Sequence, residues 1–377
     1  MIKVMSVFGT RPEAIKMAPL VKKLNADPDI DSVLCVTAQH REMLDQVLEL
    51  FELVPDHDLN IMKPNQTLSM ITANVLTGLE KVLEEEKPDI VLVHGDTSTT
   101  FTAALAAFYQ RIAVGHVEAG LRTYDMYSPF PEEVNRVLTG HLASIHFAPT
   151  QRNVDNLIKE GVTPEKIAVT GNTVVDALLE VAGKPYEFED ETLKNIDFEN
   201  RRVIAVTCHR RENLGEYMEN IFSAIRDIAE EFEDVEVVYP VHLNPKVRET
   251  AGRILSGNSR VHLIDPLSYQ PFVNLMARSY FIITDSGGMQ EEAPSLGKPV
   301  LVVRRETERP EALAAGTVKL AGVERETIAG LARELLTDKA AYDAMAHAEN
   351  PYGDGTACDR IIEALKKMYS VKEAADD

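Results

Sequence analysis

Cysteine is scarce in this chain of 377 residues: three are present, at Cys35, Cys208 and Cys358, and none of them forms a CxxC pair. A disulfide framework or a structural zinc site would need more cysteines, or cysteines at close spacing. We therefore expect free thiols, which fit a reducing cytoplasm.

Long apolar runs and an excess of positive charge are missing as well. No run approaches the ~20 apolar residues that a membrane span requires, and the apolar start at 1–8 is too short for a signal peptide. The formal net charge is −21, from 39 Lys and Arg against 60 Asp and Glu. A nucleic acid would need a basic face to displace its counterions, so we expect neither nucleic acid nor membrane as a partner. A small anion could still bind where cations gather.

What the sequence does contain is a steady alternation of short apolar runs and segments of helical periodicity, which is typical of βαβ units and a parallel sheet. The first series of expected strands lies at 2–8, 32–36, 90–93, 112–117, 145–148 and 167–169. After a charged stretch, a second series lies at 203–207, 235–239, 261–263, 280–284 and 300–303. We expect two doubly wound α/β domains, 1–170 and 171–355, with a last helix at 356–377 crossing back onto the first.

Ligands of open α/β sheets bind beyond the carboxyl ends of the strands, so the residues that follow each expected strand are the first candidates for a site. Gly9 begins the turn after the first strand, and Arg11 and Lys16 follow near a helix start, which is a natural anion site. The plainer alternative is a capped helix with solvated cations.

Three carboxylates in the first half are candidates for acid and base. Asp96 and Glu118 each follow an expected strand, and Glu132 begins a helix after two prolines, with Arg136 four residues on. Separately, Asp96 could cap a helix and Glu132 could pair with Arg136 on the surface, or Arg136 could orient Glu132 toward the site. Brought together, the carboxylates would raise at least one pKa, so that one acts as acid and another as base.

The second half offers a nucleotide site. His209 follows a strand beside two arginines, and Ser286 opens a glycine turn before a helix whose bare N–H groups could approach a diphosphate. Glu292 could hold ribose hydroxyls and Arg309 could reach phosphates. The alternative is an ordinary glycine turn; a Walker loop is absent.

Taken in order, these motifs resemble the non-hydrolysing UDP-N-acetylglucosamine 2-epimerases, a branch of the glycosyltransferase-B fold in which two Rossmann-like domains face a cleft. The resemblance covers essentially the whole chain and rests on Gly-Thr-Arg-Pro-Glu-Ala-Ile-Lys at 9–16, His-Gly-Asp-Thr at 94–97, His-Val-Glu-Ala-Gly-Leu-Arg-Thr at 116–123, Ser-Pro-Phe-Pro-Glu-Glu-Val-Asn-Arg at 128–136, His-Arg-Arg-Glu-Asn at 209–213, Asp-Ser-Gly-Gly at 285–288 and Glu-Arg-Pro-Glu at 308–311. It implies a homodimer without metal or other cofactor. It also implies that UDP-N-acetylglucosamine is epimerised at sugar carbon 2 by elimination of UDP to 2-acetamidoglucal and re-addition.

The resemblance implies a role for individual residues. Those implied to be catalytic are Asp96, Glu118, Glu132 and His209. Those implied to bind UDP or the sugar are Arg11, Lys16, Arg136, Phe272, Ser286, Gly287, Gly288, Glu292 and Arg309. A second, activating substrate pocket is implied at Gln39, Glu42, Asn65, Arg210 and His242. Two of these depart from the family pattern, because Glu42 stands for a glutamine and Asn65 for an arginine, which leaves activation in this chain open.

Three alternatives stay open. A hydrolysing epimerase would release N-acetylmannosamine and UDP, although the segment at 128–136 resembles the non-hydrolysing branch. An inactive nucleotide-sugar sensor is opposed by the retention of all three carboxylates. A metal-dependent hydrolase would use as ligands His94, Asp96, His116, Glu118 and His209.

Overall fold

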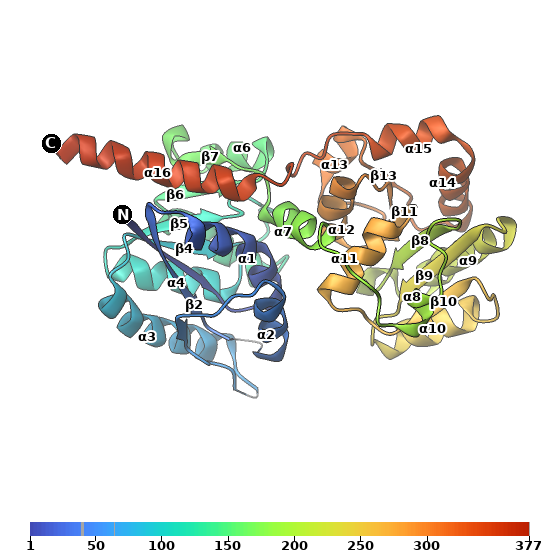
Figure 1. Ribbon diagram of the computed structural model, residues 1–377, viewed down its shortest axis with the longest axis horizontal. Helices are drawn as coiled ribbons and strands as arrows, with labels where there is room; N and C mark the ends of the chain where they lie inside the picture. The colour runs from blue at the N-terminus through green and yellow to red at the C-terminus, as the bar shows by residue number, and fades with distance from the viewer. Residues whose placement is uncertain (39–40, 64, 377) are drawn as a thin grey trace. The chain divides into compact units, whose positions relative to one another are not determined.

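The computed structural model describes residues 1–38, 41–63 and 65–376, which form two compact units (Figure 1). Unit 1 consists of Met1–Ala177 and Tyr352–Asp377, and unit 2 of Leu178–Pro351. The described residues contain no helix that combines the length and the apolar character needed to cross a membrane.

Unit 1 is built on a parallel sheet with the strand order β3-β2-β1-β4-β5-β6-β7. Its strands are β1 (Ile2–Phe8), β2 (Ile30–Val36), β3 (His57–Asp58), β4 (Ile90–His94), β5 (Ala113–Val117), β6 (Ile145–Ala148) and β7 (Ile167–Val169). Its helices are α1 (Arg11–Ala26), α2 (Arg41–Leu50), α3 (Leu68–Glu86), α4 (Ser98–Tyr109), α5 (Glu132–Leu142), α6 (Gln151–Lys159) and α16 (Ala357–Asp376), and α7 (Thr173–Ala182) runs from unit 1 into unit 2. The central strands are continuous apolar runs because helices cover both faces of such a sheet.

Unit 2 repeats the plan with the strand order β10-β9-β8-β11-β12-β13. Its strands are β8 (Arg202–Thr207), β9 (Val235–Pro240), β10 (Val261–Ile264), β11 (Phe281–Thr284), β12 (Val300–Val302) and β13 (Val318–Leu320). Its helices are α8 (Glu191–Lys194), α9 (Glu216–Glu231), α10 (Pro245–Leu255), α11 (Tyr269–Arg278), α12 (Gly287–Glu292), α13 (Pro310–Ala315), α14 (Arg325–Thr337) and α15 (Lys339–Ala346). Two doubly wound parallel sheets confirm the fold class expected from the alternation in the sequence.

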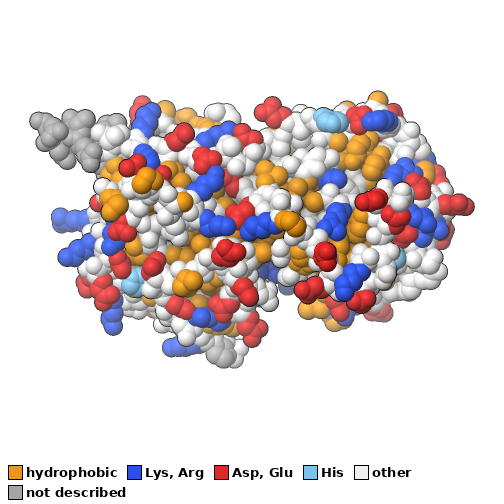
Figure 2. Space-filling view, in the orientation of Figure 1, with side chains coloured by type: hydrophobic (Ala, Val, Ile, Leu, Met, Phe, Trp, Pro, Cys, Tyr) orange, Lys and Arg blue, Asp and Glu red, His pale blue; other side chains and the backbone are white. Residues whose placement is uncertain are grey.

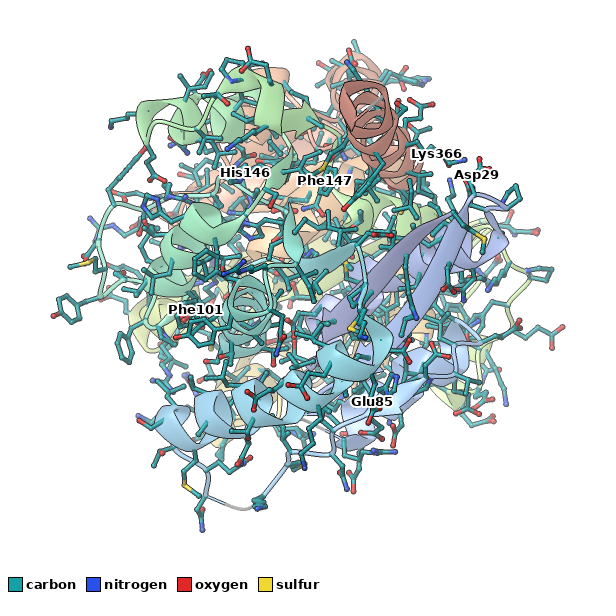
Figure 3. The ribbon with its side chains drawn as sticks, turned by 90° about the vertical axis from the view of Figure 1, so that its left-hand side faces the viewer. Asp29, Glu85, Phe101, His146, Phe147 and Lys366 are labelled. Carbon is teal, nitrogen blue, oxygen red and sulfur yellow. The ribbon has the colours of Figure 1, made fainter. Side chains whose placement is uncertain are left out.

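The end of the chain belongs to unit 1. Helix α16 packs against α1 and β7, and Lys366 Nζ lies 2.8 Å from carboxylate oxygens of both Asp27 and Asp29 (Figure 3). The Asp176 carboxylate accepts the backbone N–H groups of Ala357 and Cys358 at the start of the helix. These contacts fix the first turns of α16 on unit 1.

Over the face seen in Figure 2, Lys and Arg lie interspersed with Asp and Glu, so the excess negative charge is not gathered in one area there.

Candidate functional site

In each unit, the strand order reverses at a point that carries the candidate residues. Strand β1 pairs with β2 on one side and with β4 on the other, and β8 pairs with β9 and β11 in the same way. Ligands of doubly wound sheets bind beyond the carboxyl ends of the strands at such a reversal. The turns after β1 and β4 in unit 1, and after β8 and β11 in unit 2, occupy these positions.

Glu118 follows β5 and is held by three side chains. Its Oε2 accepts hydrogen bonds from Lys16 Nζ at 2.5 Å and from Asn172 Nδ2 at 2.9 Å, and it lies 3.5 Å from His94 Nε2. Burial disfavours the charged form, but Lys16 and His94 outweigh it and hold the pKa of Glu118 well below the ordinary value. The backbone of Glu118 has φ = 60°, a left-handed conformation that residues other than glycine rarely adopt. The structure therefore holds an ionised carboxylate in one place at some cost in backbone strain.

Asp96 follows β4, and its carboxylate accepts from Arg136 Nη2 at 2.6 Å. Burial raises the pKa of Asp96; Arg136 and Lys16 oppose this shift, while the charges of Glu118 and Glu132 add to it. Glu118 and Glu132 thus both lie close enough for their charges to act on Asp96. The structure pushes the pKa values of Asp96 and Glu118 in opposite directions, which is how a site separates an acid from a base.

Arg136 is not arranged as the sequence suggested. The expected partner was Glu132, four residues earlier on the same helix. In the structure Arg136 is 5% exposed and contacts Asp96 and, at 3.4 Å, Glu133 Oε2. Glu132 is the first residue of α5. Glu133 lies three residues before Arg136, a spacing that is equally favourable for an ion pair on a helix, and it is buried as Arg136 is.

The turn after β1 brings Arg11 to the first position of α1, where the helix dipole favours an anion. Gly9 is required before it, because a Cβ there would lie 2.0 Å from Thr37 Oγ1. Glu13 is buried and accepts the backbone N–H groups of Gly9 and Thr10. Of the two expected phosphate ligands, Arg11 therefore lies at a helix start, and Lys16 lies against Glu118.

In unit 2, a buried carboxylate fixes the turn that carries His209. Asp285 Oδ2 accepts the backbone N–H groups of His209 at 2.9 Å and Arg210 at 2.8 Å, and the Asn213 side-chain amide at 3.1 Å. The His209 ring stacks on that of His242, with centroids 5.1 Å apart. Burial lowers the pKa of His209, against the attraction of Asp285. The arrangement favours a neutral imidazole on a fixed backbone.

The expected nucleotide turn lies beside two guanidinium groups. Ser286 precedes the short helix α12, and a Cβ on Gly287 would lie 3.7 Å from Arg210 Nη2 and 3.9 Å from Arg309 Cζ. A Cβ on Gly288 would lie 3.2 Å from Glu292 Oε1. Arg309 is anchored by Glu291, to which its Nε donates a hydrogen bond. Bare backbone and two cations therefore share one corner of unit 2. Phe272, also expected to bind substrate, is half-buried on α11.

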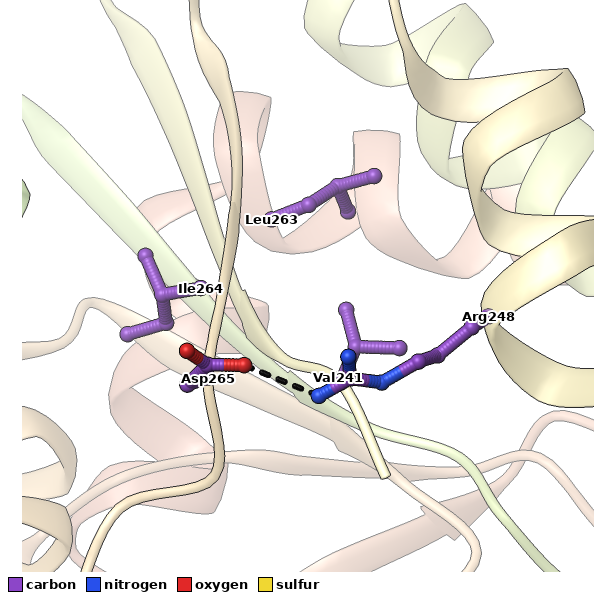
Figure 4. A pocket seen from close by; sticks show the side chains of 5 residues that line it. All are labelled: Val241, Arg248, Leu263, Ile264 and Asp265. Carbon is purple, nitrogen blue, oxygen red and sulfur yellow. Dashed lines mark hydrogen bonds and ion pairs between the residues drawn. The ribbon is translucent and has the colours of Figure 1, made fainter. Parts of the chain in front are cut away.

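A cavity of about 250 Å³ opens at the carboxyl ends of β9 and β10 (Figure 4). It is lined by Val241, Arg248, Leu263, Ile264 and Asp265. Arg248 Nη2 donates to Asp265 Oδ1 at 2.8 Å. One of its lining residues, Val241, directly precedes His242 of the stacked histidine pair in the sequence.

The residues expected in an activating pocket are spread over both units. Gln39 lies outside the described residues. Glu42 is exposed in the first turn of α2, and Asn65 is exposed with φ = 58°. Arg210 and His242 lie beside His209 in unit 2, as described above. Their regulatory role stays a prediction.

Across residues 1–38, 41–63 and 65–376, no group of three or more His, Cys, Asp or Glu side chains is arranged to hold a metal ion.

Comparison with known proteins gives one consistent result. The family model described as UDP-N-acetylglucosamine 2-epimerase matches residues 22–366. The chain is 58% identical to the UDP-N-acetylglucosamine 2-epimerase of Bacillus subtilis over 376 residues, covering 100% of this chain and 98% of that protein. It is 58% identical to the Escherichia coli protein of the same name over 370 residues, covering 97% and 98%. It is similar to the crystal structure of UDP-GlcNAc 2-epimerase from Neisseria meningitidis bound to UDP-GlcNAc, with a TM-score of 0.84 and 54% identity over 97% of this chain and 100% of that one.

Proposed function

This chain belongs to the UDP-N-acetylglucosamine 2-epimerase family, and from that premise we propose that it interconverts UDP-N-acetylglucosamine and UDP-N-acetylmannosamine without hydrolysing either. The observation that supports this most is the pair of carboxylates that follow β4 and β5 in unit 1, where Glu118 is held ionised and the pKa of Asp96 is raised. Inversion at carbon 2 requires a base on one face of the sugar and an acid on the other.

The chemistry explains why a good leaving group is needed. Carbon 2 is not adjacent to a carbonyl, so its proton is weakly acidic. As a carboxylate takes that proton, the C–H electron pair forms the C1=C2 double bond and the C1–O bond to the diphosphate breaks. The products are UDP and 2-acetamidoglucal. A proton then returns to carbon 2 from the opposite face as a diphosphate oxygen re-adds to carbon 1.

We assign the base to Glu118 and the acid to Asp96 in the direction from UDP-N-acetylglucosamine. Glu118 is the group whose pKa is lowered, so it is ionised at rest, and Asp96 is the group whose pKa is raised, so a proton is carried there more easily. In the reverse direction the two roles exchange. Glu132, whose charge acts on Asp96, is the third group that could contact the sugar.

Unit 2 would bind the nucleotide. The N–H groups after Ser286, the guanidinium of Arg309 and the neutral His209 would face the diphosphate and stabilise the charge that grows on UDP as C1–O breaks. One well-placed donor of this kind contributes roughly 3 kcal/mol to such a transition state. The proposal requires the residues of both units to act on one substrate molecule.

Replacement of Arg309 by alanine tests the nucleotide site. We expect the dissociation constant for UDP to rise about 10- to 100-fold, because a hydrogen bond to a charged group contributes about 1.5–3 kcal/mol. Titration calorimetry with UDP measures it. Arg305→Ala is the matched control, since Arg305 is an exposed arginine four residues away. Equal affinity in the Arg309→Ala protein and wild type would remove Arg309 from the phosphate site.

Proton NMR of the enzyme with UDP-N-acetylglucosamine in deuterium oxide tests the reaction itself. We expect UDP-N-acetylmannosamine to appear, with deuterium at carbon 2 of both sugars, because the abstracted proton exchanges with solvent. Stoichiometric UDP with free N-acetylmannosamine would show the hydrolysing reaction instead. Product without deuterium would contradict proton abstraction. A parallel sample with a chelator should behave identically, and loss of activity there would favour a metal-dependent enzyme.

A further inference from the structure

Glu133 is a charged residue that the mechanism above does not use, although it adjoins Glu132 on α5. It is 1% exposed. Carboxylates are almost never this deeply buried unless they are paired, because removing the charge from water is costly. Its partners therefore show what it does.

The first partners of Glu133 are backbone groups of the segment between β5 and α5. Its carboxylate accepts the N–H of Thr123 at 3.1 Å through each oxygen and that of Tyr124 at 2.8 Å. Tyr124 has φ = 63°, so the chain is held in an unfavourable conformation at this point. Since Glu118 begins this segment and Glu132 ends it, Glu133 fixes the piece of chain that carries two of the three candidate carboxylates.

The second partner of Glu133 is Arg136, which lies between two carboxylates. One guanidinium nitrogen is 2.6 Å from Asp96 Oδ2 and the other is 3.4 Å from Glu133 Oε2. The Arg136 side chain is 6% exposed, so water does little to screen these charges. Glu133 therefore competes with Asp96 for one cation and also fixes the direction from which that cation approaches Asp96.

We propose that Glu133 is a positioning residue: its buried carboxylate ties the segment after β5 to α5 and orients Arg136 against Asp96, so that Asp96, Glu118 and Glu132 are presented to the sugar in one geometry. The inference rests on the proposed function, which it deepens. It gives the two adjacent glutamates different tasks, with Glu132 facing the site and Glu133 supporting it from inside.

We expect the charge of Glu133 to affect Asp96 as well, because both carboxylates contact Arg136. The charged groups that act on Asp96 come from α5, from α1 and from the end of β5, and they are Arg136, Glu132, Lys16 and Glu118. Without the charge of Glu133, Arg136 would stabilise the Asp96 carboxylate more strongly. The pKa of Asp96 would then fall.

The test compares Glu133→Gln with Glu133→Asp. Glutamine keeps the length and one acceptor oxygen but loses the charge, whereas aspartate keeps the charge but is one methylene shorter. For Glu133→Gln we expect kcat to fall about 10- to 100-fold, with KM for UDP-N-acetylglucosamine within about threefold. Because Asp96 must hold a proton in the direction from UDP-N-acetylglucosamine, the limb of the kcat/KM profile in which activity falls with rising pH should move to lower pH. Glu133→Asp should also have a lower kcat than the wild type, but the limb of its kcat/KM profile in which activity falls with rising pH should not move.

Glu86→Gln is the matched control. Glu86 is a partly buried glutamate of unit 1, paired with Lys3 and His57, and the loss of its charge should leave kcat, KM and the pH profile unchanged. Equal losses of kcat in both Glu133 variants with an unmoved pH profile would reduce Glu133 to a structural residue and overturn the proposal. So would wild-type kinetics in Glu133→Gln.

Hydrogen exchange on the wild-type protein tests the same contacts without any variant or substrate. We expect the amide hydrogens of Thr123 and Tyr124, which donate to the buried Glu133 carboxylate, to exchange far more slowly than the amide hydrogen of the nearby exposed Met126. Exchange at the rate of an open loop would overturn the proposal even if no Glu133 variant folds. The proposed function fails by a different result, the absence of deuterated UDP-N-acetylmannosamine in the NMR experiment.

Discussion

Glu118→Gln should lower the rate of epimerisation by about a thousandfold and leave the affinity for UDP within about a factor of ten, because general base catalysis by one group contributes about 10²- to 10⁴-fold. Glutamine matches glutamate in shape but cannot take the carbon 2 proton. Lys16 also loses the charge of Glu118, since its Nζ lies 2.5 Å from Glu118 Oε2. The measurements are turnover by NMR and UDP binding by calorimetry.

The control for Glu118→Gln is Glu160→Gln. Glu160 is a second glutamate of unit 1 with a cationic partner, which here is Arg122. Glu160→Gln should retain most of the activity. If Glu118→Gln turns over at the wild-type rate, Glu118 is not an acid or base in this reaction. If Glu118→Gln instead loses turnover, and the exchange of the substrate's carbon 2 proton with deuterium oxide stops as well, the assignment of Glu118 as the base is supported.

Asp96→Asn should have an effect of similar size on product formation, about 10²- to 10⁴-fold, but a different effect on exchange. Asparagine keeps a hydrogen-bonding group beside Arg136 and cannot return a proton to carbon 2. If Glu118 removes the proton and Asp96 supplies the new one, Asp96→Asn still exchanges the carbon 2 proton of UDP-N-acetylglucosamine while making little UDP-N-acetylmannosamine.

The same NMR experiment, run on both variants, separates the two roles. We expect Asp96→Asn to exchange the carbon 2 proton without inverting carbon 2. We expect Glu118→Gln to do neither. The opposite pattern would exchange the roles of the two carboxylates. Full inversion by Asp96→Asn would remove Asp96 from the mechanism.

The fold could be predicted from the sequence largely because parallel strands are buried on both faces and appear as short apolar runs. Strand β3 (His57–Asp58) is too short to show a pattern and gave no prediction. Helix α3 was also not predicted, although Ile71, Val75 and Leu79 recur at helical spacing and are buried in the structure. The alternation of strands, helices and turns was enough to fix two doubly wound sheets without either element.

The candidate site could be predicted where residues directly follow a strand, as Asp96 and Glu118 do. Its supporting residues were not found because their roles depend on contacts between distant parts of the chain. Asn172, which donates to Glu118 from 54 positions away, had one signal, its place in a glycine turn after β7. Glu133 had no signal in the sequence, because nothing there tells a buried glutamate from an exposed one next to it. The predicted pairing of Arg136 with Glu132 was wrong for the same reason.

The central claim is that carboxylates of unit 1 and the glycine turn of unit 2 act on one substrate, and a crystal structure with UDP-N-acetylglucosamine bound tests it most directly. We expect the diphosphate on the backbone N–H groups that follow Ser286, and carboxylate oxygens of Glu118 and Asp96 on opposite faces of sugar carbon 2, at about 3–3.5 Å. A sugar bound with carbon 2 away from both carboxylates, or with both on the same face, would contradict the account.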